Sequence, residues 1–345
     1  MLNPAIHQPR PASPWPAQPF SAVVVGTGSQ VPERILTNAD LEKIVDTSDQ
    51  WITERTGMKE RHISAPGEAA SDIAVKACEM ALAEAKINPE DLDLVVVGTV
   101  TGDMPFPSTA CVLQQKLGAP HAVAFDVSAG CTGFIYALSV ARQFVVTGAS
   151  RTALVVGVEM LSKITDWTDR STCVLFGDGA GAAVLRAGTD THTGILATYL
   201  AADGTGGQHL YMPAGGSRQP ATIETVQQRL HTCKMTGNAI FKVAVRSMAD
   251  AVRHLLHQTG LKLDDVKLLI PHQANLRIIE ATTKLLKFPS ERVFVNIAKY
   301  GNTSSATTII ALDEARRAEL VHPGDVVFLV AFGAGLTWGG VAIRF

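Results

Sequence analysis

The sequence repeats itself, and this repetition constrains the fold more than any other feature. Two pairs of segments correspond: DLDLVVVGTV (91–100) with DVKLLIPHQA (265–274), and RTALVVGVEM (151–160) with GDVVFLVAFG (324–333). Both pairs are about 173 residues apart. Between them, FDVSAGCTGFIYALSVA pairs with VNIAKYGNTSSATTIIA. Equal spacing is harder to obtain by chance than similar strands, so we predict two related halves, residues 21–190 and 191–345.

Short apolar runs alternate with segments of helical period. We expect strands at 94–99, 122–127 and 153–158, and helices at 71–86, 108–117 and 238–258. Ser71 and Ser108 are expected to cap the first two helices. Strands that alternate with helices of this length predict an α/β protein with largely parallel sheets.

Composition excludes several classes of function. With 30 Lys+Arg against 32 Asp+Glu, the net charge of -2 gives no support for binding nucleic acid. Five cysteines without CxxC spacing argue against a disulfide framework and a zinc site, and fit a reducing, cytoplasmic setting; we expect no metal or other cofactor. Residues 1–20 carry six prolines and predict an extended or disordered leader. No apolar run is long enough to cross a membrane.

The most reactive group predicted by the sequence is the thiol of Cys131, which lies where an apolar run meets a segment of helical period. Gly130 and Gly133 flank it, so the backbone can bend sharply and approach a ligand closely. A thiol in the first turn of a helix faces unpaired N–H groups and the positive end of the helix dipole, which lower its pKa. We therefore predict a nucleophilic thiol with a lowered pKa.

The alternative is that Cys131 is a small buried hydrophobic residue, as free cysteine usually is. The other four cysteines serve as internal controls: Cys78, Cys111, Cys173 and Cys233. None of them combines flanking glycines with the start of a helix. This contrast favours Cys131 as the functional cysteine.

Two polar residues of the second half stand at corresponding places. His272 directly follows the apolar run LLIP, and Asn302 lies in KYGNTSS, at the corner that matches the one holding Cys131. A lone histidine after a strand is more often structural, but its position in the repeat singles this one out. Because open α/β sheets place their sites at strand ends, we expect the three side chains to meet in one cavity.

The residue types indicate acyl transfer. A cysteine paired with a histidine is typical of chemistry through a thioester. An asparagine amide donates hydrogen bonds but takes no proton, so Asn302 suits the stabilisation of a developing oxyanion. Loss of CO2 from a malonyl thioester would create such a charge, and the resulting carbanion would attack an acyl group on Cys131.

These residues resemble the β-ketoacyl-acyl-carrier-protein synthase III enzymes of the thiolase-like condensing superfamily, over roughly residues 21–345. The resemblance rests on DVSAGCTGF, TDRSTCVLFGDGAGA, IPHQANLRII, YGNTSSAT and FGAGLTWG. It implies a five-layered αβαβα fold made of two duplicated halves, and an obligate homodimer. The implied reaction joins an acyl-CoA primer to malonyl-acyl-carrier protein and starts fatty-acid synthesis.

The resemblance also implies roles for single residues. Cys131 matches the acylated nucleophile, His272 and Asn302 match the pair that promotes decarboxylation, and the backbone amides of Cys131 and Gly333 match the oxyanion hole. The remaining matches are to CoA binding (Trp51, Arg55, Arg170, Asn275), to an aromatic residue that reaches the partner subunit's acyl pocket (Phe106), and to carrier-protein contact (Lys242, Arg277).

Three alternatives stay open. The Gly-Cys-x-Gly corner loosely resembles the nucleophile elbow of hydrolases, which predicts a cysteine acyl-thioester hydrolase. A second is a condensing enzyme of the same family in a specialised pathway, and a third is a silent acyl-binding relative. Thiolases carry a second cysteine near the C-terminus and chain-elongating synthases a second histidine; this sequence has neither at the matching places.

Overall fold

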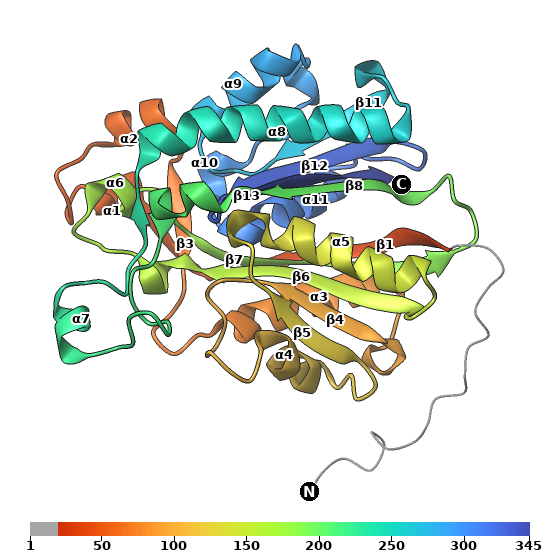
Figure 1. Cartoon of the computed structure of the whole chain (residues 1–345), viewed down its shortest axis with the longest axis horizontal. Helices are drawn as coiled ribbons and strands as arrows, with labels where there is room; N and C mark the ends of the chain where they lie inside the picture. Colours follow the sequence, from red (N-terminus) through yellow and green to blue (C-terminus); the bar gives the residue numbers. More distant parts are fainter. Residues whose placement is uncertain (1–19) are drawn as a thin grey trace, which may run out of the picture.

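A computed structural model describes residues 20–345 and contains two large β-sheets with helices on their faces (Figure 1). The first sheet has the order β1-β7-β6-β4-β5, with strands β1 (Ser21–Gln30), β4 (Leu94–Gly98), β5 (Val123–Val127), β6 (Thr152–Met160) and β7 (Asp178–Gly188). The second has the order β8-β13-β12-β11, with strands β8 (Gly194–Ala202), β11 (Val266–Pro271), β12 (Val326–Gly333) and β13 (Thr337–Arg344).

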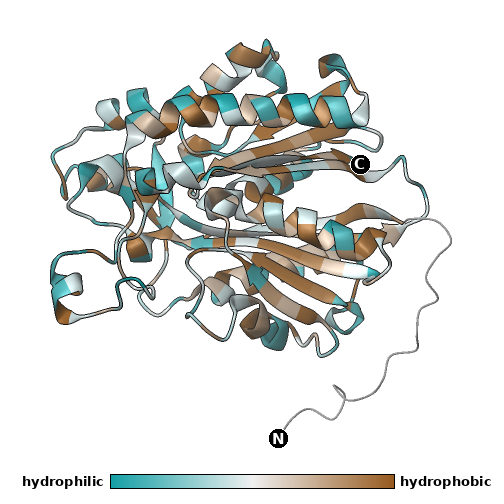
Figure 2. Cartoon of the chain, in the orientation of Figure 1, coloured by the Kyte–Doolittle hydropathy of each residue, from teal (hydrophilic) through white to brown (hydrophobic). Residues whose placement is uncertain are grey.

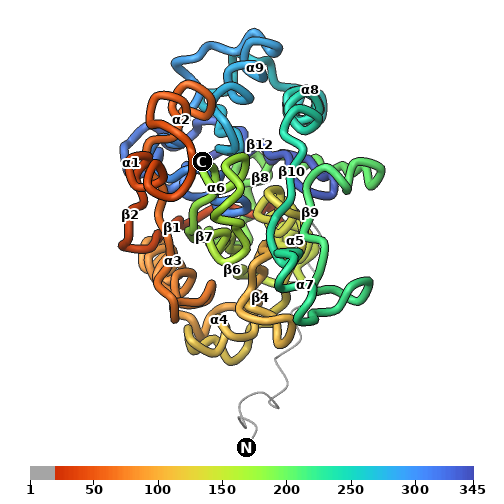
Figure 3. Tube along the Cα trace, turned by 90° about the vertical axis from the view of Figure 1, so that its left-hand side faces the viewer, coloured from red at the N-terminus to blue at the C-terminus, as the bar shows by residue number. Residues whose placement is uncertain are grey.

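Six helices complete the layers: α3 (Ala70–Ala85), α4 (Thr109–Leu117), α5 (Gly133–Val146), α8 (Gly237–Thr259), α9 (Leu276–Leu286) and α11 (Thr307–Arg317). One hydrophobic cluster joins both sheets to α5 and α11, and two further clusters join the first sheet to α3 and α4 and the second to α8 and α9. Figure 3 shows these outer helix pairs at opposite ends of the molecule. Figure 2 shows hydrophobic residues concentrated on the strands and on the helix faces that meet them. The five-layered αβαβα arrangement is as predicted.

The two sheets repeat one topology. In each, a parallel pair (β4 with β6, β11 with β12) continues into two antiparallel neighbours. The counterpart of β5 is reduced to a parallel bridge between Leu269 and Val293. The predicted division at residue 190 falls between β7 and β8, and its exact place stays a prediction.

Smaller elements surround the layers: α1 (Asn38–Leu41), α2 (Asp49–Thr56), α6 (Arg170–Cys173), α7 (Ile223–Gln227), α10 (Ile297–Tyr300), β2 (Arg34–Thr37), β3 (Glu60–Ile63), β9 (Leu210–Tyr211) and β10 (Lys234–Met235). No helix within residues 20–345 combines the length and apolar character needed to cross a bilayer. The predicted leader lies outside the described residues, apart from its last position.

Two expectations were wrong. The sheets are mixed rather than largely parallel, because β7 runs antiparallel to both β6 and β1. Between β6 and β7 the chain forms only a 3₁₀ turn, Leu161–Ile164, and the four-residue helix α6, which are too short to carry it back across the sheet as parallel neighbours require. Ser71 does not cap α3, because Ala69 is the N-cap residue. The hydroxyl of Ser71 donates to Asp103 instead. Ser108 does cap α4.

Candidate active site

Cys131 lies in a 3₁₀ turn, Gly130–Thr132, between β5 and α5. Gly130 has a φ of +54°, and a Cβ there would stand 2.8 Å from the backbone nitrogen of Ala334. A Cβ on Gly333, at the end of β12, would stand 2.5 Å from the backbone nitrogen of Cys131. The two glycines therefore let the cysteine turn of the first half touch the end of a strand of the second half.

The thiol of Cys131 does not have the lowered pKa that its position predicted. Its pKa is raised to about 12, chiefly by burial and also by the nearby Glu159 carboxylate, while the neighbouring Ser304 side chain acts in the opposite direction. Desolvation of the charged form outweighs any favourable field from the short turn and the helix behind it. The thiol is protonated at neutral pH, and a base must take its proton when it reacts.

His272 directly follows β11, where its N–H donates to the carbonyl oxygen of Val330 at 2.8 Å. Its side chain is buried, and burial lowers its pKa to about 3, so the imidazole is neutral at pH 7. The Nδ1 atom lies 2.6 Å from Oγ1 of Thr307. This contact holds the ring through Nδ1 and leaves Nε2 as the nitrogen available to a ligand.

Asn302 is held by its backbone and by one side of its amide. Its N–H donates to Leu175 at 2.9 Å, and its carbonyl oxygen accepts from the N–H of Gly177 at 3.0 Å. Its side-chain Oδ1 accepts from the N–H of Ser304 at 2.8 Å. Since the oxygen is already bonded, the NH₂ group is the part of the amide that can serve a ligand, and it can only donate.

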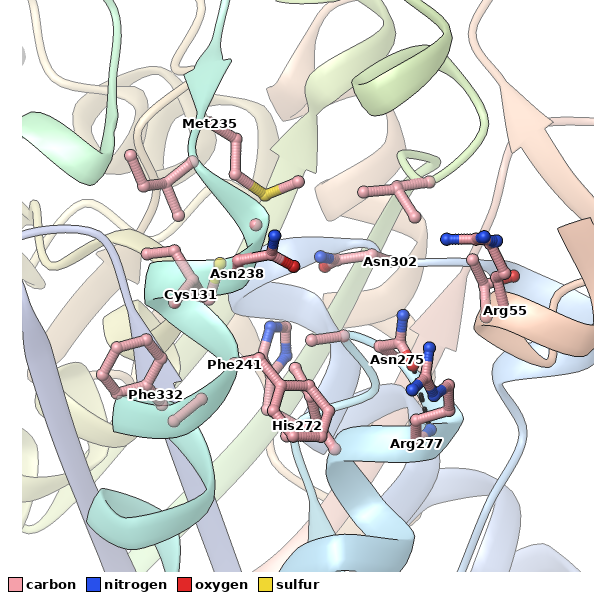
Figure 4. A pocket seen from close by; sticks show the side chains of 18 of the residues that line it. Arg55, Cys131, Met235, Asn238, Phe241, His272, Asn275, Arg277, Asn302 and Phe332 are labelled. Atoms are coloured by element: carbon pink, nitrogen blue, oxygen red, sulfur yellow. Dashed lines mark hydrogen bonds between the residues drawn. The ribbon is translucent and has the colours of Figure 1, made fainter.

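Cys131, His272 and Asn302 line a single cavity of about 690 Å³, as expected from the sequence (Figure 4). The same cavity is lined by predicted residues from three further helices: Trp51 and Arg55 of α2, Lys242 of α8, Asn275 and Arg277 at the start of α9, together with Gly333. Arg55 and Arg277 lie across the cavity from Cys131 in Figure 4. A path lined by cationic and aromatic side chains thus leads to the thiol.

Trp51 is enclosed by two guanidinium groups. The Cζ atoms of Arg55 and Arg170 each lie 4.9 Å from the centre of its ring. Arg170 does not line the cavity itself. Its guanidinium donates to the carbonyl oxygen of Asp46 at 2.7 Å. The two predicted CoA-binding residues Trp51 and Arg170 are therefore neighbours.

Phe106 is the one predicted residue that stands apart. It is 85% exposed and does not line the cavity of its own chain. It belongs to the segment between β4 and α4, where Val100 and Met104 are also exposed. The predicted contact of Phe106 with a partner subunit stays a prediction.

The sequence is similar to those of one family of known proteins. Models of 3-oxoacyl-[acyl-carrier-protein] synthase III match residues 125–204, and models of its C-terminal part match residues 256–345. The β-ketoacyl-[acyl-carrier-protein] synthase III of Caldanaerobacter subterraneus is 58% identical, covering 94% of this chain and 98% of that protein. The protein of the same name from Symbiobacterium thermophilum is 53% identical, covering 93% and 97%.

The chain belongs to the β-ketoacyl-[acyl-carrier-protein] synthase III family. Solved structures share its fold. The 3-oxoacyl-[acyl-carrier-protein] synthase III of Aquifex aeolicus is 48% identical with a TM-score of 0.87, covering 94% of this chain and all of that one. The priming β-ketosynthase of the R1128 polyketide pathway is 36% identical with a TM-score of 0.88, covering 96% and 98%. The fold is therefore thiolase-like, as the resemblance implied.

Sequence reasoning missed several residues of this synthase III site. Asn238, Phe241 and Phe332 line the cavity, and Figure 4 places Asn238 between Cys131 and Asn302. Behind the thiol lie Ser304 and the buried carboxyl group of Glu159. A signal for Glu159 was present, because it is the only charged residue within the apolar strand β6.

Proposed function

We propose that this protein is a β-ketoacyl-[acyl-carrier-protein] synthase III that condenses an acyl-CoA primer with malonyl-acyl-carrier protein and so initiates fatty-acid synthesis. The observation that carries the proposal is the joint presence of Cys131, His272 and Asn302 on one cavity, with the amide of Asn302 turned to donate. That arrangement supplies one nucleophile and two neutral donors, which suits acyl transfer followed by decarboxylation.

In the first half-reaction, Cys131 attacks the thioester carbonyl of the primer and CoA leaves. The developing oxyanion lies near the backbone amides of Cys131 and Gly333, whose contact across the two halves requires glycine at 333. Backbone N–H groups held in this way stabilise the charge without reorganising during the reaction.

In the second half-reaction, malonyl-acyl-carrier protein loses CO2 and its carbanion attacks the acyl group on Cys131. As CO2 leaves, before this attack, negative charge grows on the malonyl thioester oxygen. Asn302 donates to it from its NH₂ group. His272 donates from Nε2 once the Thr307 hydroxyl turns its single proton from the Ser304 carbonyl oxygen, its acceptor at 3.0 Å, to Nδ1. Because burial keeps His272 neutral, it acts as a hydrogen-bond donor rather than as a cation.

The outer part of the cavity suits CoA and a carrier protein. We expect adenine to stack between the indole of Trp51 and the guanidinium of Arg170, which must move away from its present place 4.9 Å from the ring centre. Arg55 and Asn275 line the cavity for the rest of CoA. Lys242 and Arg277 line the mouth, and Lys242 also borders a second hollow of about 480 Å³ between α8 and α9. Basic side chains at this mouth favour an acidic carrier protein.

A homodimer is part of this proposal. Strand β5 is the edge of the first sheet, and all its residues are at least partly exposed, unlike those of β4 and β6. An exposed edge strand is a template for pairing with another chain. Phe106, 85% exposed in the neighbouring segment, would then enter the partner subunit's acyl pocket. The free state of all five cysteines fits a reducing compartment such as the cytoplasm.

The decisive experiment is a product assay with labelled malonyl-acyl-carrier protein and acyl-CoA. Release of CO2 together with a β-ketoacyl product supports the proposal, whereas free acid without a new C–C bond supports the hydrolase alternative. Mass spectrometry of the Cys131 peptide after incubation with acyl-CoA tests the silent alternative, which predicts no adduct. A panel of primers compared by kcat/KM distinguishes a general from a specialised pathway.

A further inference from the structure

Glu159 has no role in the function proposed above, yet it is placed behind the nucleophile. It is fully buried in β6. Its carboxyl group accepts from the backbone N–H of Val100 and from the hydroxyls of Thr99 and Thr101, all just after β4. A buried carboxyl group is costly to keep, even when it is hydrogen-bonded, so its presence in an apolar strand indicates a task.

Ser304 connects Glu159 to the thiol. Its hydroxyl donates to Oε1 of Glu159 at 3.2 Å, and it lies close enough to the Cys131 thiol to lower the pKa of that thiol. One hydroxyl thus lies between the proton to be removed and a group that can accept it.

The backbone of Ser304 supports the same conclusion. Its φ is +49°, in the left-handed region that favours glycine, and its counterpart in the first half is indeed Gly130 with a φ of +54°. A residue with a side chain costs roughly 1–2 kcal/mol there. The fold accepts this strain at a position where a glycine would fit, and the gain is a hydroxyl between Cys131 and Glu159.

We propose that Glu159, acting through the hydroxyl of Ser304, takes the proton of Cys131 when the thiol attacks an acyl group. As the bond from Sγ to the carbonyl carbon forms, the thiol proton moves to Oγ of Ser304 and the proton of Ser304 moves to Oε1 of Glu159. The bond to the leaving group breaks, and CoA departs as a thiolate that water protonates. Cys131 and Ser304 are the groups at the reacting atom, and Glu159 is the buried proton acceptor.

The same path returns the proton to Cys131 in the condensation step. For that step the inference deepens the proposed function and rests on it. When the carbanion takes the acyl group, Cys131 leaves as a thiolate and regains its proton from Glu159 through Ser304. Over the whole cycle one proton is consumed, which the released CoA thiolate takes from water. The protein ends with the charges it started with.

The competing base would be His272, and the structure disfavours it. Burial lowers the pKa of His272 to about 3, which makes it a weak base, whereas burial raises the pKa of Glu159 to about 7, close to the working pH of a general base. His272 reaches Ser304 only indirectly, through the hydroxyl of Thr307, which lies 3.0 Å from the Ser304 carbonyl oxygen. Cys131 is the ionisable group on the other side of Ser304 from Glu159. The groups that donate to Glu159 from Thr99, Val100 and Thr101 are uncharged.

The test uses the full chain and p-nitrophenyl acetate, which acylates a thiol without CoA or a carrier protein. The wild-type rate of Cys131 acylation is expected to rise as pH increases through about 7, because only the ionised Glu159 accepts a proton. Glu159→Gln and Ser304→Gly should each be slower by about 10²-fold and lose this rise. Peptide mass spectrometry assigns the adduct, with the exposed Cys111 as an internal control.

Asp178→Asn is the matched control. Asp178 is also fully buried and accepts from a serine hydroxyl, that of Ser162 at 2.5 Å, but no cysteine stands behind that serine. The variant should keep both the rate and the pH profile. Should Glu159→Gln fail to fold, Ser304→Gly decides, since it removes backbone strain as it removes the hydroxyl.

The sign of the effect separates the proposal from a purely electrostatic role. The negative charge of Glu159 raises the pKa of Cys131, so a carboxylate that acted only through its charge would make Glu159→Gln faster. A folded Glu159→Gln that acylates Cys131 at the wild-type rate or faster overturns the proposal. Acylation that follows the expected pattern without any condensation would leave it standing and refute the proposed function instead.

Discussion

Gly333→Ala is expected to slow acylation of Cys131 by primer while the fold is kept. The new Cβ would stand 2.5 Å from the nitrogen of Cys131, 3.0 Å from that of Thr132 and 3.1 Å from Cα of Cys131. Non-bonded heavy atoms are comfortable at about 3.5 Å, so the cysteine turn must retreat by about 1 Å. Because the obstructing atoms belong to the backbone, no change of rotamer relieves the clash.

The magnitude follows from this displacement. A misplacement of about 1 Å costs about 10²-fold in rate, and overpacking costs about 1–3 kcal/mol in unfolding free energy. Single-turnover release of CoA measures acylation, thermal unfolding measures stability, and malonyl decarboxylation without primer should stay close to wild type because Asn302 and His272 are not displaced. Gly67→Ala is the control, since a Cβ there meets nothing within 4 Å. A Gly333→Ala enzyme that released CoA at the wild-type rate would refute the reasoning.

Three further outcomes are expected. Asn302→Ala should slow decarboxylation of malonyl-acyl-carrier protein by about 10²–10³-fold, measured as labelled CO2, and an unchanged rate would contradict its role. Burial lowers the pKa of His272 from 6.5 to about 3, so the unfolded chain binds a proton that the folded chain does not, and stability is lost as pH falls below about 6.5. This loss amounts to roughly 2 kcal/mol between pH 7 and pH 5. Because the raised pKa of Glu159 contributes with the opposite sign over the same range, urea titrations should show the loss as the difference between the wild type and His272→Gln. Trp51→Ala should raise the KM for acyl-CoA about tenfold, since stacking of a base is worth about 1–3 kcal/mol, and equal KM values would exclude Trp51 from the CoA site.

The fold class was predictable because it depends on local periodicity and on the repeat. Helix α4, helix α8 and strand β6 lie within a few residues of their predicted places. Strand direction was not predictable, since the antiparallel return of β7 depends on how the segment around α6 packs against the rest of the molecule. The cap of α3 was missed for a similar reason: Ser71 bonds to Asp103, which is 32 residues further along the chain.

The sequence indicated which residues form the site, but not the environment that sets their protonation. The glycines around Cys131, the position of His272 after an apolar run and the matching corner of Asn302 pointed to one cavity, because strand ends of a duplicated fold converge. Only the tertiary structure decided the protonation of that cavity. The pKa of Cys131 is raised because chain from both halves removes the thiol from water, and Ser304 joins Glu159 across 145 residues of sequence. Desolvation and such long-range contacts depend on what packs around a group, which no local pattern records.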